Sequence, residues 1–135
     1  MTRLKLFPTA LLLAVFLSAC NAAEAPDPNL ENTSWNVVKI NGEPLPEGIE
    51  ITAIFTDETI GGNAPCNVYT ADYSQDGSQI NIDAPIMTQI YCDEENVMET
   101  EEAFTQALVS VRQVKLEGNN LLMLDDRETV ALLLE

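Results

Sequence analysis

The side chains that could do chemistry in this sequence are three cysteines and a large excess of carboxylates. There is no histidine among the 135 residues, so the commonest general base and transition-metal ligand is missing. Cys20, Cys66 and Cys92 show neither the Cys-x-x-Cys spacing of redox sites nor a zinc pattern. No glycine-rich phosphate loop or serine nucleophile elbow occurs. The sequence therefore predicts a protein that is not an enzyme and uses no metal or cofactor.

Other polar residues are better explained by structure than by catalysis. Thr88 has no base near it in the sequence, so its hydroxyl is expected to tie a strand to a loop rather than attack a substrate. Asp93-Glu94-Glu95 lacks the ligand spacing and glycine turn of a calcium loop, and acids there suit the positive end of a helix dipole. Asp125-Asp126 is typical of a turn between strands.

Residues 1–20 have the pattern of an export signal. A short basic region precedes an apolar run over residues 7–17, and Leu17-Ser18-Ala19-Cys20 ends the segment with small side chains. The apolar run is too short to span a bilayer, which takes about 20 residues. Leu-Ser-Ala-Cys resembles the lipobox of bacterial lipoproteins, which implies a diacylglycerol on Cys20 and cleavage before it. An ordinary signal peptide, in which the cysteine is incidental, is the alternative.

The lipobox resemblance also implies a location. Several acyl chains would hold the protein permanently, because each buried CH₂ contributes about 0.8 kcal/mol. Asn21 stands where Asp would resemble an inner-membrane retention signal, so we expect a lipid anchor in the outer membrane, on its periplasmic face. Residues 1–19 are then a signal peptide. Residues 20–32, which include two prolines, are a flexible tether, and residues 33–135 are the folded domain.

If Cys20 is acylated, Cys66 and Cys92 remain as an even pair. In an oxidising periplasm such a pair favours a disulfide. The bridge would close a loop of about 26 residues and stabilise the fold by about 3–4 kcal/mol in the chain-entropy model. Two alternatives stay open, which are a pair of unpaired buried thiols and a redox or metal pair.

The charge excludes one class of partner. The chain has 6 basic and 22 acidic residues, a net charge of −16. Arg3 and Lys5 would leave with the signal peptide, so that 4 basic residues face 22 acidic ones and the charge becomes −18. Nucleic acids are bound mainly through Lys and Arg that neutralise phosphates, so we expect no nucleic-acid partner. A well-solvated surface is the simplest interpretation of the excess acid.

The body of the chain predicts short strands separated by turn residues. Asp76-Gly77 is the strongest hairpin signal, whereas Gly61-Gly62-Asn63 is expected to interrupt a strand. Thr88–Cys92 is a short strand or an extended segment. Alternating apolar residues predict strands at Thr33–Ile40, Glu50–Thr56, Cys66–Ser74, Ser78–Asp83, Gln113–Glu117, Leu121–Leu124 and Thr129–Leu134.

One helix is expected late in the chain, over about Asn96–Ser110. Asn96 followed by Glu99 is typical of a capping box. The helix should bury an apolar stripe of Val97, Phe104, Leu108 and Val111, and leave Glu101, Glu102 and Thr105 facing away. Strands with a single late helix fit no alternation of strand and helix. We therefore predict an α+β fold, with a curved antiparallel sheet or incomplete β-barrel of about seven or eight strands and one packed α-helix.

A series of short motifs runs through this predicted domain. They are Leu30, Thr33-Ser34-Trp35, Ile40-Asn41-Gly42, Gly61-Gly62-Asn63-Ala64-Pro65-Cys66-Asn67 with Tyr69 and Tyr73, Met87-Thr88 four residues before Cys92, and Met98, Glu101 or Glu102, Phe104 and Leu108. In order and spacing they resemble the META/HslJ domain family of small bacterial envelope proteins, over about residues 30–134. Pro65 departs from the family, which has Gly there. Because proline forbids the positive φ that glycine permits, the turn into Cys66 is expected to differ.

The resemblance implies an incomplete antiparallel barrel and no known reaction; members are associated with envelope stress. Among the family-motif residues Asn67, Tyr69 and Thr88, the Asn67 amide is expected to bond turn backbone, with a ligand contact as the alternative. Five aromatic residues are expected to pack in the core, or alternatively to line a cavity for a small apolar ligand. They are Trp35, Tyr69, Tyr73, Tyr91 and Phe104.

Together these features predict a non-enzymatic envelope lipoprotein with a binding or structural role in envelope integrity or stress response. Its partners are expected to be the membrane, through the lipid anchor, and either an envelope protein or a small apolar ligand. The alternative function is an assembly or pilot factor that docks another envelope protein.

Overall fold

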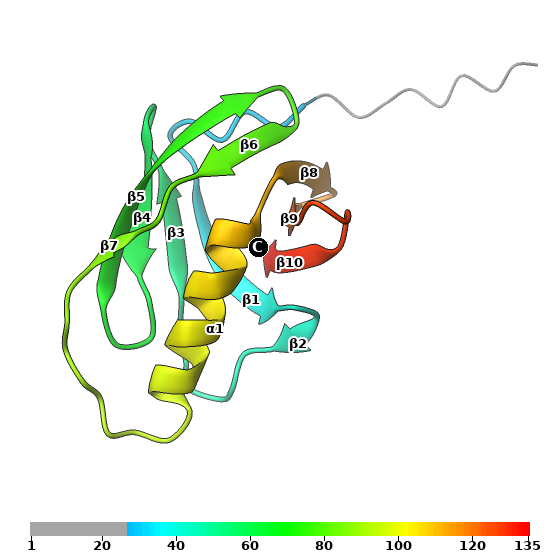
Figure 1. Ribbon diagram of the computed structural model, residues 1–135. Helices are drawn as coiled ribbons and strands as arrows, with labels where there is room; N and C mark the ends of the chain where they lie inside the picture. Colours follow the sequence, from blue (N-terminus) through cyan, green and yellow to red (C-terminus); the bar gives the residue numbers. More distant parts are fainter. Residues whose placement is uncertain (1–26) are drawn as a thin grey trace, which may run out of the picture.

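The computed structural model describes residues 27–135; the expected signal peptide, Cys20 and the first part of the expected tether lie outside them. The described residues form ten strands and one helix (Figure 1). In chain order these are β1 (Ser34–Ile40), β2 (Glu43–Pro44), β3 (Thr52–Phe55), β4 (Thr59–Asn63), β5 (Val68–Asp76), β6 (Gln79–Ile82), β7 (Ile86–Met87), α1 (Val97–Ser110), β8 (Gln113–Glu117), β9 (Asn120–Leu124) and β10 (Val130–Leu134).

The strands make one antiparallel sheet that curls until its ends meet. The order is β10-β9-β8-β6-β5-β4-β3-β1-β2, with β7 beside β5 and β1 also paired to β10. The ring is uneven because β6 and β8 share a single residue pair, Gln79 with Gln113. The expected α+β fold with a curved antiparallel sheet and one helix is confirmed. The strand number is higher than expected because β2 and β7 have two residues each and carry no alternating pattern, and because β4 contains glycines that were expected to interrupt a strand.

Helix α1 covers one side of the curled sheet and packs against β1 and β10 (Figure 1). Most of the expected stripe is buried, with Phe104 and Leu108 each 1% exposed and Val111 not exposed at all, whereas Val97 in the first turn is only half-buried. Phe104 meets Tyr69 of β5 edge to face, with ring centroids 5.1 Å apart. Helix and sheet therefore share one apolar core.

Strand β1 does not follow the simple alternation expected of it. Alternation places Trp35 and Val37 on one face and Val38 and Ile40 on the other, yet Val37 and Ile40 are both buried. The pairing with β10 shifts register between Val37 and Lys39, which is a bulge. One extra residue there turns Ile40 back to the core side.

The expected break at Gly61-Gly62-Asn63 is wrong, because all three residues belong to β4. A Cβ at Gly62 would lie 2.3 Å from the Thr52 carbonyl oxygen and 2.7 Å from the Thr52 hydroxyl. The Asn63 N–H donates to the same hydroxyl over 2.9 Å. Glycine is therefore needed here for close approach of two strands, which is a known role of glycine inside a sheet.

We expect Gly62→Ala to lower the free energy of unfolding by about 3 kcal/mol, the upper end of what overpacking usually costs. The cause is the overlap with Thr52 backbone, which cannot move without shifting β3. Gly118→Ala is the matched control: no atom lies within 4 Å of its Cβ, and its positive φ of 63° should cost only about 1 kcal/mol. Urea unfolding of both variants measures the difference, and equal losses would contradict this account of Gly62.

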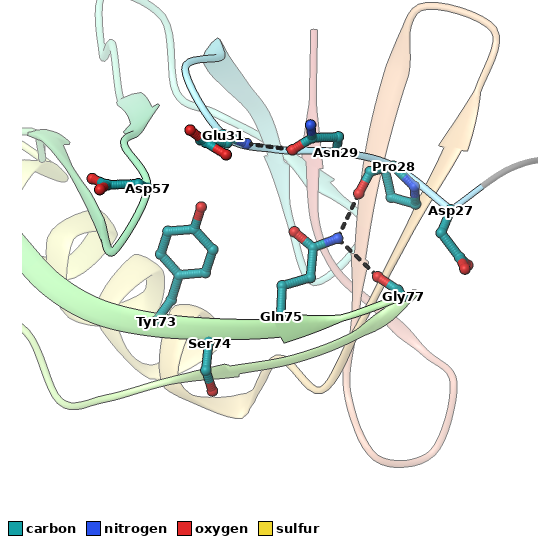
Figure 2. A pocket seen from close by; sticks show the side chains of 9 residues that line it. All are labelled: Asp27, Pro28, Asn29, Glu31, Asp57, Tyr73, Ser74, Gln75 and Gly77. Atoms are coloured by element: carbon teal, nitrogen blue, oxygen red, sulfur yellow. Dashed lines mark hydrogen bonds between the residues drawn. The ribbon is translucent and has the colours of Figure 1, made fainter.

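The last part of the expected tether belongs to the folded domain. Leu30 has no exposed surface, and the Thr33 hydroxyl donates to its carbonyl over 2.6 Å. Figure 2 shows the Gln75 amide donating to the Pro28 carbonyl and, over 2.8 Å, to that of Gly77. Residues from about Pro28 onward are therefore fixed to the β5–β6 hairpin, so the tether is shorter than the sequence indicated.

The start of α1 also differs from expectation. Asn96 has the left-handed φ of 66° and its side chain makes no capping hydrogen bond, so the expected capping box with Glu99 is wrong. The Asn96 carbonyl instead accepts from the Thr100 N–H over 2.9 Å. Within residues 27–135 no helix has the length and apolar character that crossing a membrane requires.

Candidate functional site

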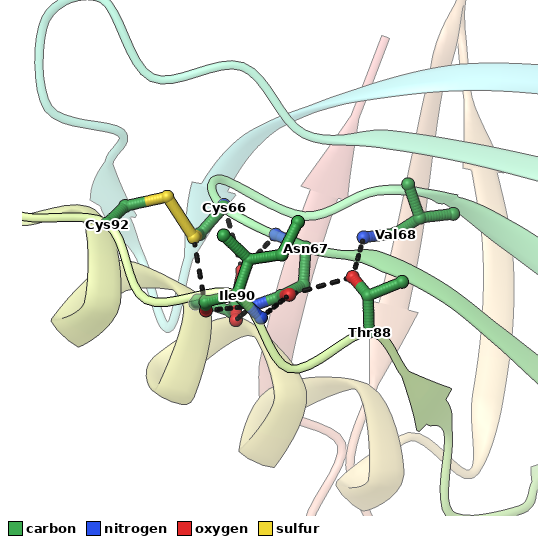
Figure 3. Close-up of a disulfide and its surroundings, with 7 residues drawn as sticks. Cys66, Asn67, Val68, Thr88, Ile90 and Cys92 are labelled. Atoms are coloured by element: carbon green, nitrogen blue, oxygen red, sulfur yellow. Dashed lines mark hydrogen bonds between the residues drawn. A yellow bond between two sulfur atoms is a disulfide. The ribbon is translucent and has the colours of Figure 1, made fainter.

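The disulfide joins the start of β5 to the segment between β7 and α1. Cys66 and Cys92 are bonded, with their Cα atoms 5.9 Å apart (Figure 3). Ile90 lies beside the bridge, and its carbonyl oxygen is 3.4 Å from the Cys66 sulfur. A disulfide sulfur carries no proton, so this approach is a contact and not a hydrogen bond. The bridge therefore pins the 88–92 segment along the edge of β5.

Asn67 lies directly beneath the disulfide and uses its entire side-chain amide on the protein. Its oxygen accepts from the Thr88 hydroxyl over 2.7 Å and from the Ile90 N–H over 2.8 Å. Its nitrogen donates to the Ile90 carbonyl over 3.0 Å and to Glu101 Oε1 over 2.6 Å. An asparagine amide offers two donors and two acceptor positions, so none remains for a ligand. The geometry favours the structural role over the ligand contact.

Glu101 is the site residue that sequence reasoning missed. It was expected to face away from the core, yet it is only 7% exposed. Its Oε2 accepts from the backbone N–H groups of Cys66, over 2.9 Å, and Asn67, over 2.7 Å. A signal was present, because position 101 fills the gap of seven residues in the stripe between Val97 and Phe104, at the helical spacings of four and three.

The other motif residues divide between this cluster and the core. The Thr88 hydroxyl accepts from the Val68 N–H over 3.1 Å and donates to Asn67, so it ties loop to strand as expected. Tyr69 lies one residue further along β5, is 2% exposed, and donates its hydroxyl to the Thr52 carbonyl over 2.9 Å. Burial raises the pKa of the Tyr69 hydroxyl well above its ordinary value. Tyr69 thus belongs to the core and not to the polar cluster.

We call Asn67, Thr88, Glu101 and the Cys66–Cys92 bridge the clamp. Every buried side-chain nitrogen and oxygen among residues 27–135 has a hydrogen-bond partner, those of the clamp included. The same residues contain no group of three or more acidic or cysteine side chains placed to hold a metal ion. Because its donors and acceptors are satisfied internally, the clamp is suited to fixing two chain segments rather than to chemistry.

The five aromatic residues do not converge on one cavity. Tyr69 and Phe104 pack in the core, and Phe55 meets Tyr73 edge to face with centroids 5.3 Å apart. Tyr91 is instead 75% exposed beside the disulfide. Tyr69 and Phe104 therefore follow the expected core packing, whereas Tyr91 lies on the surface.

Open grooves indent the surface that residues 27–135 form, and two of them are large enough to consider. The first, of about 360 Å³, lies between the start of the domain and β5, with Asp27, Glu31, Asp57 and Tyr73 among its lining residues (Figure 2). Partial burial, and then the carboxylates of Glu31 and Asp57, raise the pKa of the Tyr73 hydroxyl, which donates to the Thr56 carbonyl over 2.7 Å. The second, of about 540 Å³, runs between β7 and α1.

An uneven antiparallel barrel, one helix on its side and a crosslinked clamp at the helix start define a class of small α+β domains. Residues 28–135 match the model of the META domain, which is most of the chain. The chain therefore belongs to the META domain family. No curated protein matches the sequence significantly.

Solved structures show the same fold at low sequence identity. One is an NMR structure of a protein from Burkholderia xenovorans, with a TM-score of 0.62, 18% identity, and coverage of 98% of this chain and 97% of that one. Another is a crystal structure of a DUF4847 family protein from Bacteroides vulgatus, with a TM-score of 0.57, 17% identity, and coverage of 78% and 92%. At these identities the likeness is one of fold.

Proposed function

We propose that this META domain is the body of a lipid-anchored envelope protein that works by binding and not by catalysis. The observation that carries the proposal is the clamp, in which every polar atom of the carboxylate, amide and hydroxyl is already hydrogen-bonded within the protein. The Leu17-Ser18-Ala19-Cys20 segment supports the anchor. The disulfide supports an oxidising compartment such as the periplasm, where such bridges persist.

The proposed partner is a protein rather than a small apolar ligand. The aromatic residues that could line a ligand cavity are packed against each other, as Tyr69 with Phe104, or exposed, as Tyr91. By contrast, large apolar side chains are exposed on β3, β5, β7 and the segment after β7, and the strand pairing places Ile54 and Ile86 in the same cross-strand row. The exposed side chains are Ile54, Val68, Ile86, Ile90 and Tyr91, between 49% and 76% exposed. Exposed apolar groups that cluster in this way favour protein contact.

The anchor is tested by mass spectrometry of the amino-terminal peptide after expression of the full chain in a bacterium. We expect cleavage before Cys20, a thioether-linked diacylglycerol and an acylated amino terminus. Cys20→Ala is the control, and it should leave the protein unacylated and recovered in the soluble periplasmic fraction. An unmodified first residue on a wild-type protein that washes freely from membranes would refute the anchor.

A second candidate function is assembly, in which the domain docks another envelope component and escorts it. The observation that favours it is position: Figure 1 shows the chain entering the domain beside the β5–β6 hairpin, at the opposite end from the segment between β7 and α1. The exposed Ile90 and Tyr91 are therefore presented away from the tether. Crosslinking of intact membranes separates the two candidates, since a single stoichiometric partner supports docking and the absence of any partner contradicts it.

A further inference from the structure

We propose that the groove between β7 and α1 binds an extended, positively charged segment of another envelope protein. The inference rests on the binding function proposed above, and it specifies the surface and the chemistry of the partner. Three independent features of the molecule support it, which are the lining of the groove, the free edge of β7 and the distribution of charge.

The groove has an apolar floor and an acidic rim. Met87 and Met98 are half-buried within it, while Glu99, Glu102 and Gln106 on α1 are exposed. Unbranched methionine side chains adapt to different apolar partners, which suits a surface that binds a peptide. A volume of about 540 Å³, open to solvent along its length, fits a few residues of extended chain better than an enclosed small molecule.

Strand β7 offers a backbone edge beside this groove. It pairs with β5 through Met87 to Tyr69 and Ile86 to Thr70, and within residues 27–135 β5 is its only strand partner. On the other side Met87 approaches α1, with its sulfur 3.6 Å from the Thr105 hydroxyl. An edge strand can accept an added strand from another protein, whose backbone supplies affinity while alternate side chains fill pockets. A segment laid along β7 would place alternate side chains over Met87 and Met98.

The charge around the groove selects a basic partner. The sequence contains no Lys or Arg between Lys39 and Arg112, a stretch that includes β3 to β7 and all of α1. Asp93, Glu94 and Glu95 are exposed where the chain leaves Tyr91, and Glu99 and Glu102 continue the acidic rim. Such a surface repels a second copy of this chain, whose net charge is −16, and it repels anionic lipid. Lys and Arg that flank apolar residues would complement it.

The position of the groove favours a protein partner over the membrane that would hold the anchor. Six residues lie between Cys20 and Asp27, which makes seven steps along the chain, and an extended chain spans at most about 3.5 Å per step, so this tether reaches about 24 Å. The tether joins the domain at the end remote from the β7–α1 segment (Figure 1). The groove would thus open into the periplasm, where protein segments are the available occupants.

The first test places a photocrosslinking amino acid at Gln106, in the groove, of the full-length protein in intact membranes. We expect a crosslink to one envelope protein, within a segment in which Lys or Arg alternate with apolar residues. The same probe at the exposed Glu128, in the turn before β10, is the matched control and should not reach that protein. Crosslinks to phospholipid or to a second copy, or equal capture from both positions, would overturn the inference.

The second test uses purified protein and a synthetic ten-residue peptide of alternating Lys and Val. Binding should shift backbone amide resonances of Met87, Met98 and Gln106, and a peptide with Ser in place of Val should bind at least about tenfold more weakly, as expected when apolar burial is lost. We expect Glu99→Gln with Glu102→Gln to weaken binding about three- to tenfold. Glu43→Gln with Glu47→Gln removes the same charge elsewhere and should change affinity less than twofold.

Resonance shifts spread over the whole acidic surface, or equal weakening by both pairs of substitutions, would mean that the peptide binds by general charge attraction. Either result would refute the proposal that the groove is the binding site. This test is separate from that of the anchor. If the protein is lipidated but its groove does not bind the peptide, only the proposed binding site is refuted. If the protein is not lipidated but its groove binds the peptide, only the proposed lipid anchor is refuted.

Discussion

Replacement of both bridged cysteines, as Cys66→Ser with Cys92→Ser, should lower the free energy of unfolding by about 3–4 kcal/mol. The bridge spans a sequence separation of 26 residues, and the entropy it removes from the unfolded chain sets this size. The clamp should survive the change in part, because the Cys66 N–H donates to Glu101 whatever the side chain. We therefore expect a folded but less stable domain, measured by urea unfolding without reductant.

Reduction of the wild-type protein provides the matched comparison. Dithiothreitol should lower wild-type stability by about as much as the double substitution does, because both remove the crosslink, and a thiol and a serine hydroxyl at position 66 each have a proton to donate to the Ile90 carbonyl. The same reductant should leave the double variant unchanged. A wild-type protein whose unfolding is indifferent to reductant would show that the bridge does not form in solution, and full labelling of both cysteines after denaturation would show the same.

The fold could be predicted from this sequence wherever the spacing of the apolar residues matches the period of the strand or helix that they form. Tyr69, Ala71 and Tyr73 alternate along β5 and face inward as expected, and Ile80 and Ile82 do so along β6. Where the arrangement depends on a distant strand the local pattern fails. Nothing in the residues around Gly62 indicates that Thr52 approaches it, and nothing near Val37 indicates the bulge that pairing with β10 produces.

Most residues of the site could be predicted from the sequence, but the hydrogen bonds that join them could not. Cysteine counting favoured the bridge between Cys66 and Cys92 that the structure contains, and Asn67 and Thr88 were singled out by a family motif. Glu101 was missed because a charged residue inside an apolar stripe is normally placed at the surface. It is buried because three N–H donors of Cys66 and Asn67, two residues far from it in the sequence, converge on its carboxylate, a condition that only tertiary structure reveals.

These contacts explain how a small domain presents a binding groove of fixed shape. Glu101 lies on the same helix as Glu99 and Glu102 of the rim, and its carboxylate holds that helix against the start of β5. Asn67 and Thr88 hold the 88–90 segment, which continues directly from β7. The two walls of the groove are therefore both fixed by the clamp. Loss of the clamp should release the walls as well as lower stability.

Glu101→Ala should consequently be the most damaging substitution in α1, with a loss of about 3–5 kcal/mol in the free energy of unfolding. It removes the acceptor of three hydrogen bonds and leaves the backbone N–H groups of Cys66 and Asn67, and one of the two side-chain N–H groups of Asn67, without a partner. Each unsatisfied buried donor costs about 1–3 kcal/mol, and relaxation toward water recovers part of the total. The neighbouring Glu102→Ala, at an exposed position, is the matched control and should change stability by no more than about 0.5 kcal/mol.

Glu101→Gln distinguishes the hydrogen-bonding role from simple filling of space. Its amide oxygen can still accept from the two backbone N–H groups, but its NH₂ would then face the Asn67 NH₂, where Glu101 Oε1 now accepts. Two donors cannot satisfy each other, so we expect an intermediate loss of about 1–3 kcal/mol. Double-mutant cycles with Asn67→Ala should give a coupling energy of about 1–3 kcal/mol, and exchange of the Cys66 and Asn67 amide hydrogens should accelerate. If Glu101→Ala proved no more destabilising than Glu102→Ala, the carboxylate would not be the acceptor that holds helix to sheet.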